Sequence, residues 1–231
     1  TATCTFSVIP TDTTVPTITC PGNQTVSFGP ACNYTLLNYT SLATTADNCD
    51  ATVTVTQSPA VGTVITGTTV VTLTATDDAG NTATCTFSVI PTDTTVPTIT
   101  CPGNQNVSFS ASCNYTLLDY TSLATTADNC DATVTVTQSP AVGTVITGTT
   151  VVTLTATDDA GNTATCTFNV VPTDTTVPTI TCPGNQNVSF SASCNYTLLD
   201  YTSLATTADN CDASVTVTQS PAVGTVITGT T

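Results

Sequence analysis

The feature that most constrains this chain is an 81-residue internal repeat that fills nearly all of its length. The segment that opens at Thr1 begins again at Thr82 and at Thr163, and residues 1–81 differ from residues 82–162 at only five positions. A unit of this length is too long for a solenoid repeat and has the size of a small autonomous domain. The sequence therefore predicts a tandem array of small domains. The predicted boundaries are a last strand of a preceding repeat over 1–11, full repeats over 12–92 and 93–173, and a truncated repeat over 174–231.

The copies begin and end at unusual points of the repeat. The first residues match the end of a later copy, and Thr231 lies twelve residues short of three full periods. We interpret the sequence as a window on a longer array. The alternative is that residues 1–10 form a strand donated to the last repeat of a neighbouring chain. The twelve missing residues argue against that alternative because they include a whole predicted strand.

Each repeat has the pattern of a series of short β-strands separated by turns. Residues 51–56 alternate strictly, which places Val53 and Val55 inward and threonine outward. The longest predicted strand covers residues 69–76, and residues 82–90 close the unit after a tight Asp-Asp-Ala-Gly-Asn turn. Residues 33–39 are predicted as a strand and residues 41–50 as a polar loop. About seven strands in about 80 residues indicate an all-β, immunoglobulin-like, antiparallel Greek-key sandwich in every repeat.

The composition excludes several classes of function. The chain has a net charge of −15 and no lysine, arginine or histidine. Without cations it cannot bind nucleic acid or anionic lipid by charge. Without histidine or lysine it lacks an imidazole base and a Schiff-base nucleophile, so we predict that it is not an enzyme. No apolar run approaches the ~20 residues needed to cross a bilayer, so no membrane insertion is expected.

Four sequence blocks, taken in order, resemble the hyalin repeat, or HYR domain. They are Cys20-Pro21, Ala46-Asp-Asn-Cys49, Gly67-Thr-Thr-Val-Val-Thr-Leu-Thr-Ala-Thr-Asp77 and Ala79-Gly-Asn-Thr-Ala-Thr-Cys-Thr-Phe87. The resemblance extends over the whole chain. It implies an immunoglobulin-like extracellular module without catalytic activity. Such modules occur in adhesive and matrix proteins of animals and in large repetitive bacterial surface proteins, and the near-identity of the copies favours the latter group.

The twelve cysteines, four in each period, predict a disulfide framework and an oxidising compartment. No CxxC motif occurs, which disfavours a zinc site. The favoured bonds are Cys20–Cys85 and Cys101–Cys166, which join first to last strands, together with Cys32–Cys49, Cys113–Cys130 and Cys194–Cys211. The alternative partner for Cys32 is Cys130 of the next repeat. Cys4 and Cys182 are expected to pair outside the sequence.

The aspartates recur at fixed positions in three segments that share one pole of an immunoglobulin-like sandwich. Several carboxylates at one pole repel one another, and a Ca²⁺ ion between domains would relieve the repulsion and stiffen the array. The alternative is that these residues are ordinary turn formers. The candidate calcium ligands are Asp12, Asp47, Asp50, Asp77 and Asp78 in one copy and Asp93, Asp128, Asp131, Asp158 and Asp159 in the next.

The linkers carry candidate glycosylation sites. Asp12-Thr13-Thr14 resembles an O-glycosylation motif of some secreted bacterial proteins, and the same motif recurs at Thr94 and Thr175. Surface glycans would keep so uncharged a surface soluble. The alternative is that outward threonines are simply good strand formers.

Taken together, these patterns predict an extracellular structural repeat protein. We expect a secreted, disulfide-stabilised stalk, rod or filament on or outside the cell, whose partners are neighbouring repeats or other copies of itself. The alternative is a multivalent, calcium-dependent cell-surface adhesin that holds a surface or glycan ligand. An aspartate-dependent enzyme is the third hypothesis, and the recurrence of every aspartate as a turn residue argues against it.

Overall fold

The structure, a computed structural model, describes all 231 residues, and its regular secondary structure is almost entirely β-strand. No helix is long or apolar enough to span a membrane. The predicted all-β architecture is confirmed. The helical segments are three short 3₁₀ turns, η1 (Thr40–Leu42), η2 (Thr121–Leu123) and η3 (Thr202–Leu204).

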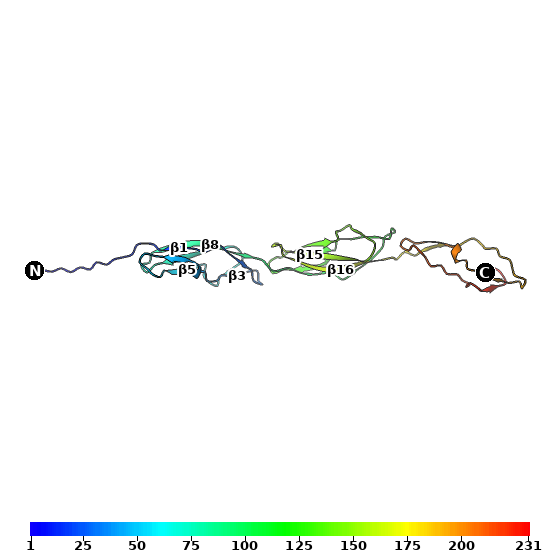
Figure 1. The fold of residues 1–231 in the computed structure, drawn as a ribbon, viewed down its shortest axis with the longest axis horizontal. Coiled ribbons are helices and arrows are strands. Elements are labelled where there is room, and N and C mark those ends of the chain that lie inside the picture. The colour runs from blue at the N-terminus through cyan, green and yellow to red at the C-terminus, as the bar shows by residue number, and fades with distance from the viewer. The chain divides into compact units, whose positions relative to one another are not determined.

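The first repeat is a β-sandwich of eight short strands (Figure 1). Strands β2, β8, β7 and β5 form one sheet in that order, while β1 pairs with β4 and β3 with β6. Most pairs are antiparallel, but β2 runs parallel to the end of β8. The strands are β1 (Thr17–Thr19), β2 (Gln24–Ser27), β3 (Tyr34–Thr35), β4 (Thr44–Ala46), β5 (Thr54–Ser58), β6 (Val64–Ile65), β7 (Thr69–Thr76) and β8 (Thr82–Thr92).

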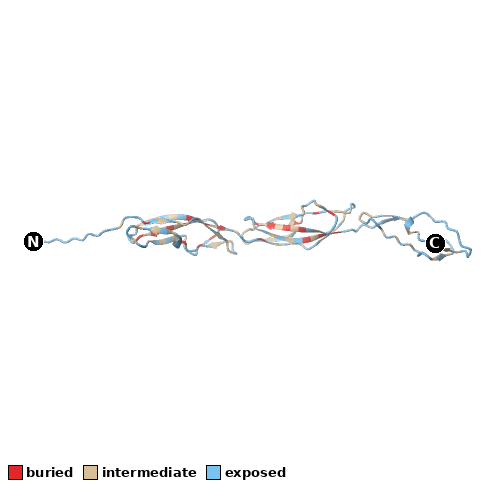
Figure 2. Ribbon diagram, in the orientation of Figure 1, coloured by how far each residue is buried: buried red, intermediate tan, exposed pale blue.

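The core of this repeat follows from the period-two pattern of its two longest strands. On β7, Val71 and Leu73 are fully buried and Thr72 between them is half-buried. Buried residues, red in Figure 2, lie along the strands of the sandwich. On β8, Phe87 and Val89 face the same core. The ring of Tyr39 packs edge-on against Phe87 with centroids 5.4 Å apart. Each such buried side chain contributes about 1.5–3 kcal/mol of hydrophobic stabilisation.

The segment after the second strand differs from the prediction. Residues 33–39 form only the two-residue strand β3, and the predicted polar loop 41–50 contains η1 and strand β4. The backbone leaves the ladder because the Gln57 side chain accepts the Tyr39 N–H at 2.8 Å. The carboxamide oxygen of Asn38 then accepts the Thr40 N–H at 3.0 Å, which starts the 3₁₀ turn.

The later repeats reuse the same elements. In the second repeat β10 pairs parallel with β16 and β11 pairs antiparallel with β14, as their counterparts do in the first. The strands of the second repeat are β9 (Thr98–Thr100), β10 (Gln105–Ser108), β11 (Tyr115–Thr116), β12 (Thr125–Ala127), β13 (Thr135–Ser139), β14 (Val145–Ile146), β15 (Thr150–Thr157) and β16 (Thr163–Thr173). Those of the third are β17 (Thr179–Thr181), β18 (Tyr196–Thr197), β19 (Thr206–Ala208) and β20 (Val226–Ile227).

The chain divides into two compact units that do not follow the sequence repeats. The first unit holds the first repeat together with two segments of the second repeat that include its aspartate-rich loops. The second unit holds the remainder. The first unit is Thr1–Ile99, Thr126–Thr135 and Ala156–Ala164, and the second is Thr100–Thr125, Val136–Thr155 and Thr165–Thr231.

Candidate functional site

Four aspartates of the first repeat converge at one end of its sandwich. Asp12 precedes β1, Asp47 and Asp50 lie in the loop after β4, and Asp77 follows the last residue of β7. One carboxylate oxygen from each lies within 4.8 Å of the others. The β1–β4 pairing, in which Thr17 is opposite Ala46, brings two of these segments together. We call these four residues the acidic cluster of the first repeat.

The acidic cluster is held in place by hydrogen bonds to the backbone. Oδ1 of Asp47 accepts the N–H groups of Cys49 at 2.9 Å and Asp50 at 3.1 Å. Oδ1 of Asp77 accepts the Asn81 N–H at 2.7 Å, and the Asn81 carboxamide donates to Oδ2 of Asp77 at 2.7 Å. These bonds belong to ordinary aspartate turns, so the turn-forming role is present whether or not a cation binds.

Two carboxylate oxygens of the cluster are left without a partner. Oδ2 of Asp12 and Oδ2 of Asp47 are inaccessible to solvent and accept no hydrogen bond. An unpaired buried acceptor costs about 1–3 kcal/mol, and more when it is charged. Ligand oxygens on opposite sides of a Ca²⁺ ion lie about 4.8 Å apart, since each bond is about 2.4 Å. These four aspartates are the residues that could hold a hard divalent cation, which prefers oxygen ligands.

The most buried member of the cluster is ionised at neutral pH. Asp77 is only 5% exposed. Burial acts to raise the pKa of its carboxyl, but the hydrogen bonds from Asn81, Gly80 and Ala79 together outweigh burial and lower it. The nearby thiol of Cys49 shows the opposite effect. Local desolvation, followed by the charges of Asp12, Asp47 and Asp50, raises the pKa of that thiol.

Four of the other predicted ligands form a second cluster, Asp93, Asp128, Asp131 and Asp158. Asp174, Asp209 and Asp212, which the sequence analysis did not select, form a smaller cluster in the third repeat. Asp78 and Asp159 are exposed and their carboxylates are not among these convergent oxygens. Their backbones serve the site instead, because the Asp78 N–H donates to Oδ2 of Asp50 at 2.9 Å and the Asp159 N–H to Oδ2 of Asp131 at 2.9 Å.

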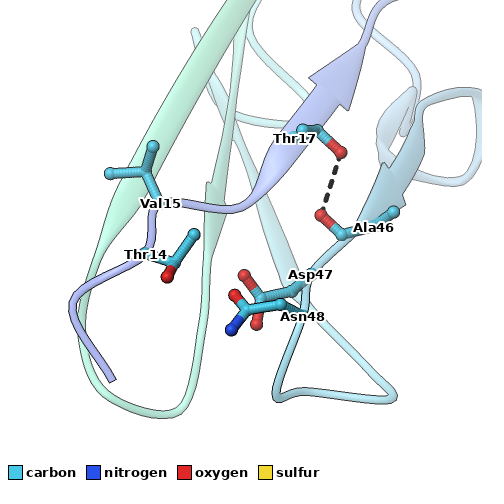
Figure 3. A pocket seen from close by; sticks show the side chains of 6 residues that line it. All are labelled: Thr14, Val15, Thr17, Ala46, Asp47 and Asn48. Atoms are coloured by element: carbon cyan, nitrogen blue, oxygen red, sulfur yellow. Dashed lines mark hydrogen bonds between the residues drawn. The ribbon is translucent and has the colours of Figure 1, made fainter. Parts of the chain in front are cut away.

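A shallow cavity of about 250 Å³ opens beside the cluster. In Figure 3 the side chains of Asp47 and Asn48 point toward the Thr14–Val15 segment, and the Thr17 hydroxyl donates to the Ala46 carbonyl at 2.9 Å. The lining residues of the cavity are Thr14, Val15, Thr17, Ala46, Asp47 and Asn48.

Two disulfides close individual repeats. Cys20 bonds Cys85 and Cys101 bonds Cys166, each with Cα atoms 5.6 Å apart, and these are the first-to-last-strand pairs favoured from the sequence. Each bond closes a loop with a sequence separation of 65. On chain entropy alone such a loop contributes roughly 4 kcal/mol.

The predicted bonds Cys32–Cys49, Cys113–Cys130 and Cys194–Cys211 are wrong. The structure bonds Cys32 to Cys130, with Cα atoms 4.9 Å apart, and Cys113 to Cys211, with Cα atoms 5.0 Å apart. Each of these bonds joins one repeat to the next, which is the alternative that the sequence leaves open.

Cys32 and Cys49 cannot meet because they lie at opposite ends of β8. The turn that carries Cys32 follows Phe28, whose N–H donates to Thr92 at the end of β8. The loop that carries Cys49 is tied through Asp50 to the hairpin before β8. Ten residues of extended strand separate these ends, which is about 33 Å. The sequence signal for this result was the length of the last strand, which spans the sandwich.

Four cysteines are free and exposed, namely Cys4, Cys49, Cys182 and Cys194. The candidate glycosylation sites Thr13, Thr94 and Thr175 are exposed in the segments before β1, β9 and β17. Their modification stays a prediction.

Sequence reasoning missed two asparagines that organise the site. The Asn81 carboxamide also donates to the Asp12 carbonyl at 3.3 Å, which ties the segment before β1 to the hairpin. Asn129 donates from its carboxamide to the Gly29 carbonyl at 3.3 Å, beside the Cys32–Cys130 bond. The available signal was the Asp-Asn-Cys triplet, which places an asparagine before this cysteine in every copy.

Comparison with known proteins identifies curated relatives. The chain is 35% identical over 218 residues to Hyalin of Strongylocentrotus purpuratus, covering 88% of this chain and 18% of that protein. It is 33% identical over 189 residues to Hyalin of Lytechinus variegatus, covering 79% of this chain and 36% of that protein. The chain thus spans less than two fifths of either relative. Both are sea-urchin proteins, so they do not support the expected kinship with bacterial surface proteins.

Among solved structures, the Protocadherin GammaB4 extracellular domain is similar with a TM-score of 0.36 and 18% identity, covering 73% of this chain and 35% of that one. The sequence profile of the HYR domain matches residues 11–90 and residues 92–171. These two tandem matches cover well over half of the sequence, and the chain therefore belongs to the HYR domain family.

Proposed function

We propose that this chain is an extracellular structural repeat protein whose domains are linked by disulfides into a stalk, rod or filament on or outside the cell. It acts by holding a fixed covalent connection between successive domains. It has no catalytic role. Its partners are its own neighbouring repeats and other copies of the same repeat.

The observation that carries this proposal is the pair of bonds between repeats. Cys32–Cys130 and Cys113–Cys211 each span a sequence separation of 98 and connect one copy to the next. A protein that only displays independent binding domains gains nothing from such bonds, because flexible linkers serve multivalent binding equally well. A protein that transmits tension gains directly, because the bonds shorten the length of backbone that carries force from one domain to the next.

Four further features support an extracellular location. Structural disulfides persist in oxidising environments and are rare in the cytosol. The HYR resemblance implies extracellular modules, and the exposed linker threonines suit modification by glycans. The absence of lysine and arginine leaves no site for trypsin-like proteases, which suits a long-lived exterior structure.

Immunogold labelling of intact cells tests the proposal. An antibody raised against one repeat is applied to unpermeabilised cells and, as the control, to permeabilised cells. We expect label on threads outside the cell in both samples. Label that appears only after permeabilisation contradicts the proposal.

A second candidate function is a multivalent, calcium-dependent adhesin. The observation that favours it is the pair of unpartnered buried oxygens on Asp12 and Asp47 within a set of four convergent carboxylates. A bound cation would neutralise this end of the repeat and fix the loops that line the cavity in Figure 3. The residues that would hold the ion are Asp12, Asp47, Asp50 and Asp77.

A further inference from the structure

The first cysteine of each bond between repeats lies in a turn whose backbone shape does not depend on the bond. We call residues 29–33 the cysteine turn of the first repeat. The Gly29 N–H donates to the Asn33 carbonyl at 2.7 Å, and the Cys32 N–H donates to the Gly29 carbonyl at 3.0 Å. Cys32 has a backbone φ of 50°, a left-handed conformation that few residues with a Cβ atom adopt. The equivalent Cys194 carries no disulfide and has a φ of 52°, so the turn itself sets the direction of the cysteine side chain.

A side-chain amide from the next repeat binds the cysteine turn beside the disulfide. The Asn129 carboxamide donates to the Gly29 carbonyl at 3.3 Å, next to the Cys32–Cys130 bond. Nδ2 of Asn129 also lies 3.3 Å from the sulfur of Cys130. One amide group therefore contacts both the turn that carries the first cysteine and the sulfur of the second.

The junction between the second and third repeats has the same arrangement. The Asn210 carboxamide donates to the Ser110 carbonyl at 3.2 Å, next to the Cys113–Cys211 bond, and its Nδ2 lies 3.3 Å from the sulfur of Cys211. The accepting residue is a glycine in one junction and a serine in the other. Because the acceptor is a backbone carbonyl in both, the amide recognises the shape of the turn and not a side chain.

The burial of the two asparagines gives a reason for an amide at this position. Oδ1 of Asn129 and Oδ1 of Asn210 are inaccessible to solvent and accept no hydrogen bond, which is unfavourable. Turning either amide over would place Oδ1 against a carbonyl oxygen, so the donor must face the turn. An apolar residue would fill the space without leaving a buried acceptor unpaired, but it could not donate this bond.

The loop that carries Asn129 also packs with the preceding repeat. Residues Thr126–Thr135 belong to the compact unit that holds the first repeat and not to the unit that holds most of the second. The junction is therefore a packed contact as well as a covalent link. Such a contact can form while both cysteines are still thiols.

We propose that Asn129 and Asn210 are positioning residues for the disulfides between repeats. Each amide binds the backbone carbonyl of a cysteine turn and so holds the cysteine that follows it beside the correct partner before oxidation. The docked contact raises the effective concentration of one thiol at the other, which favours this pairing over the alternatives. The inference rests on the proposed function, because the bonds that it concerns are the links between domains that the function needs.

The step that the amide assists is thiol–disulfide exchange with an external disulfide, for which oxidised glutathione serves in vitro. The Cys32 thiolate attacks oxidised glutathione, and one glutathione thiolate leaves. The Cys130 thiolate then attacks Sγ of Cys32 in the mixed disulfide, and the second glutathione leaves. Two thiols of the protein lose two protons and two electrons, and one oxidised glutathione becomes two reduced molecules.

The equilibrium constant of each disulfide, measured separately in the full chain, tests the proposal. The chain is reduced, brought to equilibrium in a glutathione redox buffer and alkylated, and its bonds are then mapped by mass spectrometry after cleavage before aspartate. This cleavage releases Cys130 in the short fragment between Asp128 and Asp131, so its bond to Cys32 has a mass of its own.

Asn129→Ala removes the donor, so the equilibrium constant of the Cys32–Cys130 bond should fall about 2- to 10-fold, as expected for the loss of one hydrogen bond. The other three disulfides should keep their wild-type constants. Asn129→Asp preserves the shape of the side chain but sets an oxygen against the Gly29 carbonyl, so the constant should fall further. A side chain that only fills space would tolerate this isosteric change.

Asn48→Ala and Asn48→Asp are the matched controls, because Asn48 has the same place in the loop of the first repeat and its carboxamide donates only to the neighbouring Cys49 sulfur. Both should leave all four constants unchanged. A Cys32–Cys130 constant that is the same in wild type and both Asn129 variants overturns the proposal, and so does an equal fall at all four bonds. Either result leaves the proposed function standing, whereas a wild type that never forms the Cys32–Cys130 bond would overturn both.

Discussion

At the scale of single residues, charge is the dominant physical problem of this chain. All fifteen acidic residues are aspartates and no side chain carries a positive charge. The aspartates are therefore stabilised by hydrogen bonds, as Asp77 is by the N–H and the carboxamide of Asn81 in the hairpin that follows it. Where the backbone supplies too few donors, as at Oδ2 of Asp12 and Asp47, a carboxylate oxygen remains buried and unpaired.

The first prediction concerns calcium. Asp47→Asn keeps an acceptor for the Cys49 and Asp50 N–H groups but removes one charge, so the loop should fold unchanged. By titration calorimetry we expect the number of Ca²⁺ ions bound by the chain to fall by about one, and the calcium-dependent rise in unfolding temperature to shrink. Asp119→Asn, outside the clusters, should change neither. Equal binding by wild type and Asp47→Asn would refute the calcium site.

The second prediction concerns alkaline stability. Burial, followed by the hydrogen bond to Tyr34, raises the pKa of Tyr39 from 10.0 to about 12, and the same causes act on Tyr120 through Tyr115. The folded state therefore holds these protons more tightly than the unfolded chain. Their contribution to stability is complete below pH 10 and is lost as the pH rises toward 12.

Urea unfolding followed by circular dichroism between pH 9 and pH 12 checks this prediction. The wild type should lose stability over that range. The variant Tyr39→Phe/Tyr120→Phe should lose less, while matching the wild type more closely at pH 7. A wild-type stability that is constant across the range would contradict the assigned role of these tyrosines.

At the scale of elements, β7 and β8 define the fold because their alternation is long and regular. Val71, Leu73 and Ala75 are fully buried on one face of β7, and Val70 beside them is 58% exposed. Leu73→Ala should therefore cost about 2–5 kcal/mol of unfolding free energy. Val70→Thr keeps a β-branched residue on the outer face and should stay within about 0.5 kcal/mol of the wild type. Urea midpoints measure both, and similar losses in the two variants would mean that the register of β7 is misassigned.

How well the secondary structure could be predicted from the sequence differs from one strand to the next. The strict alternation of residues 51–56 predicted Val53 and Val55 as inward, and both are half-buried between exposed threonines, because a period of two is visible without tertiary information. The region of β3, η1 and β4 was not predicted, because its backbone is positioned by a side chain from another strand, Gln57. Such a contact leaves no local pattern in the sequence.

In the candidate site, too, some features could be predicted from the sequence and others could not. The convergence of Asp12, Asp47, Asp50 and Asp77 follows from placing three loops at one end of a sandwich, and the structure brings those four together. The absence of Asp78 from the acidic cluster depends on side-chain direction within a turn, which the spacing of residues along the sequence does not determine. The partner of Cys32 depends on how far apart the two ends of β8 lie, and pairing within one repeat ignored that distance.

At the scale of the whole molecule, the four disulfides interleave along the sequence. Each bond within a repeat overlaps a bond between repeats, so no backbone segment between Cys20 and Cys211 lies outside a covalent loop. The shortest covalent path between those two cysteines uses the Cys20–Cys85 and Cys113–Cys211 bonds and the 28 residues from Cys85 to Cys113. Tension applied to the chain therefore bypasses β7 and β16, whereas residues 85–92 of β8 lie on the path that carries it.

The most direct test of the central claim, that successive repeats are joined by disulfides, is single-molecule stretching of the unreduced chain by its ends. At ~3.5 Å per residue the account predicts that the Cys20–Cys211 segment extends to only ~100 Å. The variant Cys32→Ser/Cys113→Ser leaves a path of 61 residues, from Cys85 to Cys101 and from Cys166 to Cys211, and should extend to ~210 Å. Reduction should release all 191 residues, or ~670 Å. A wild-type segment that reaches ~210 Å or more without reductant would contradict the account.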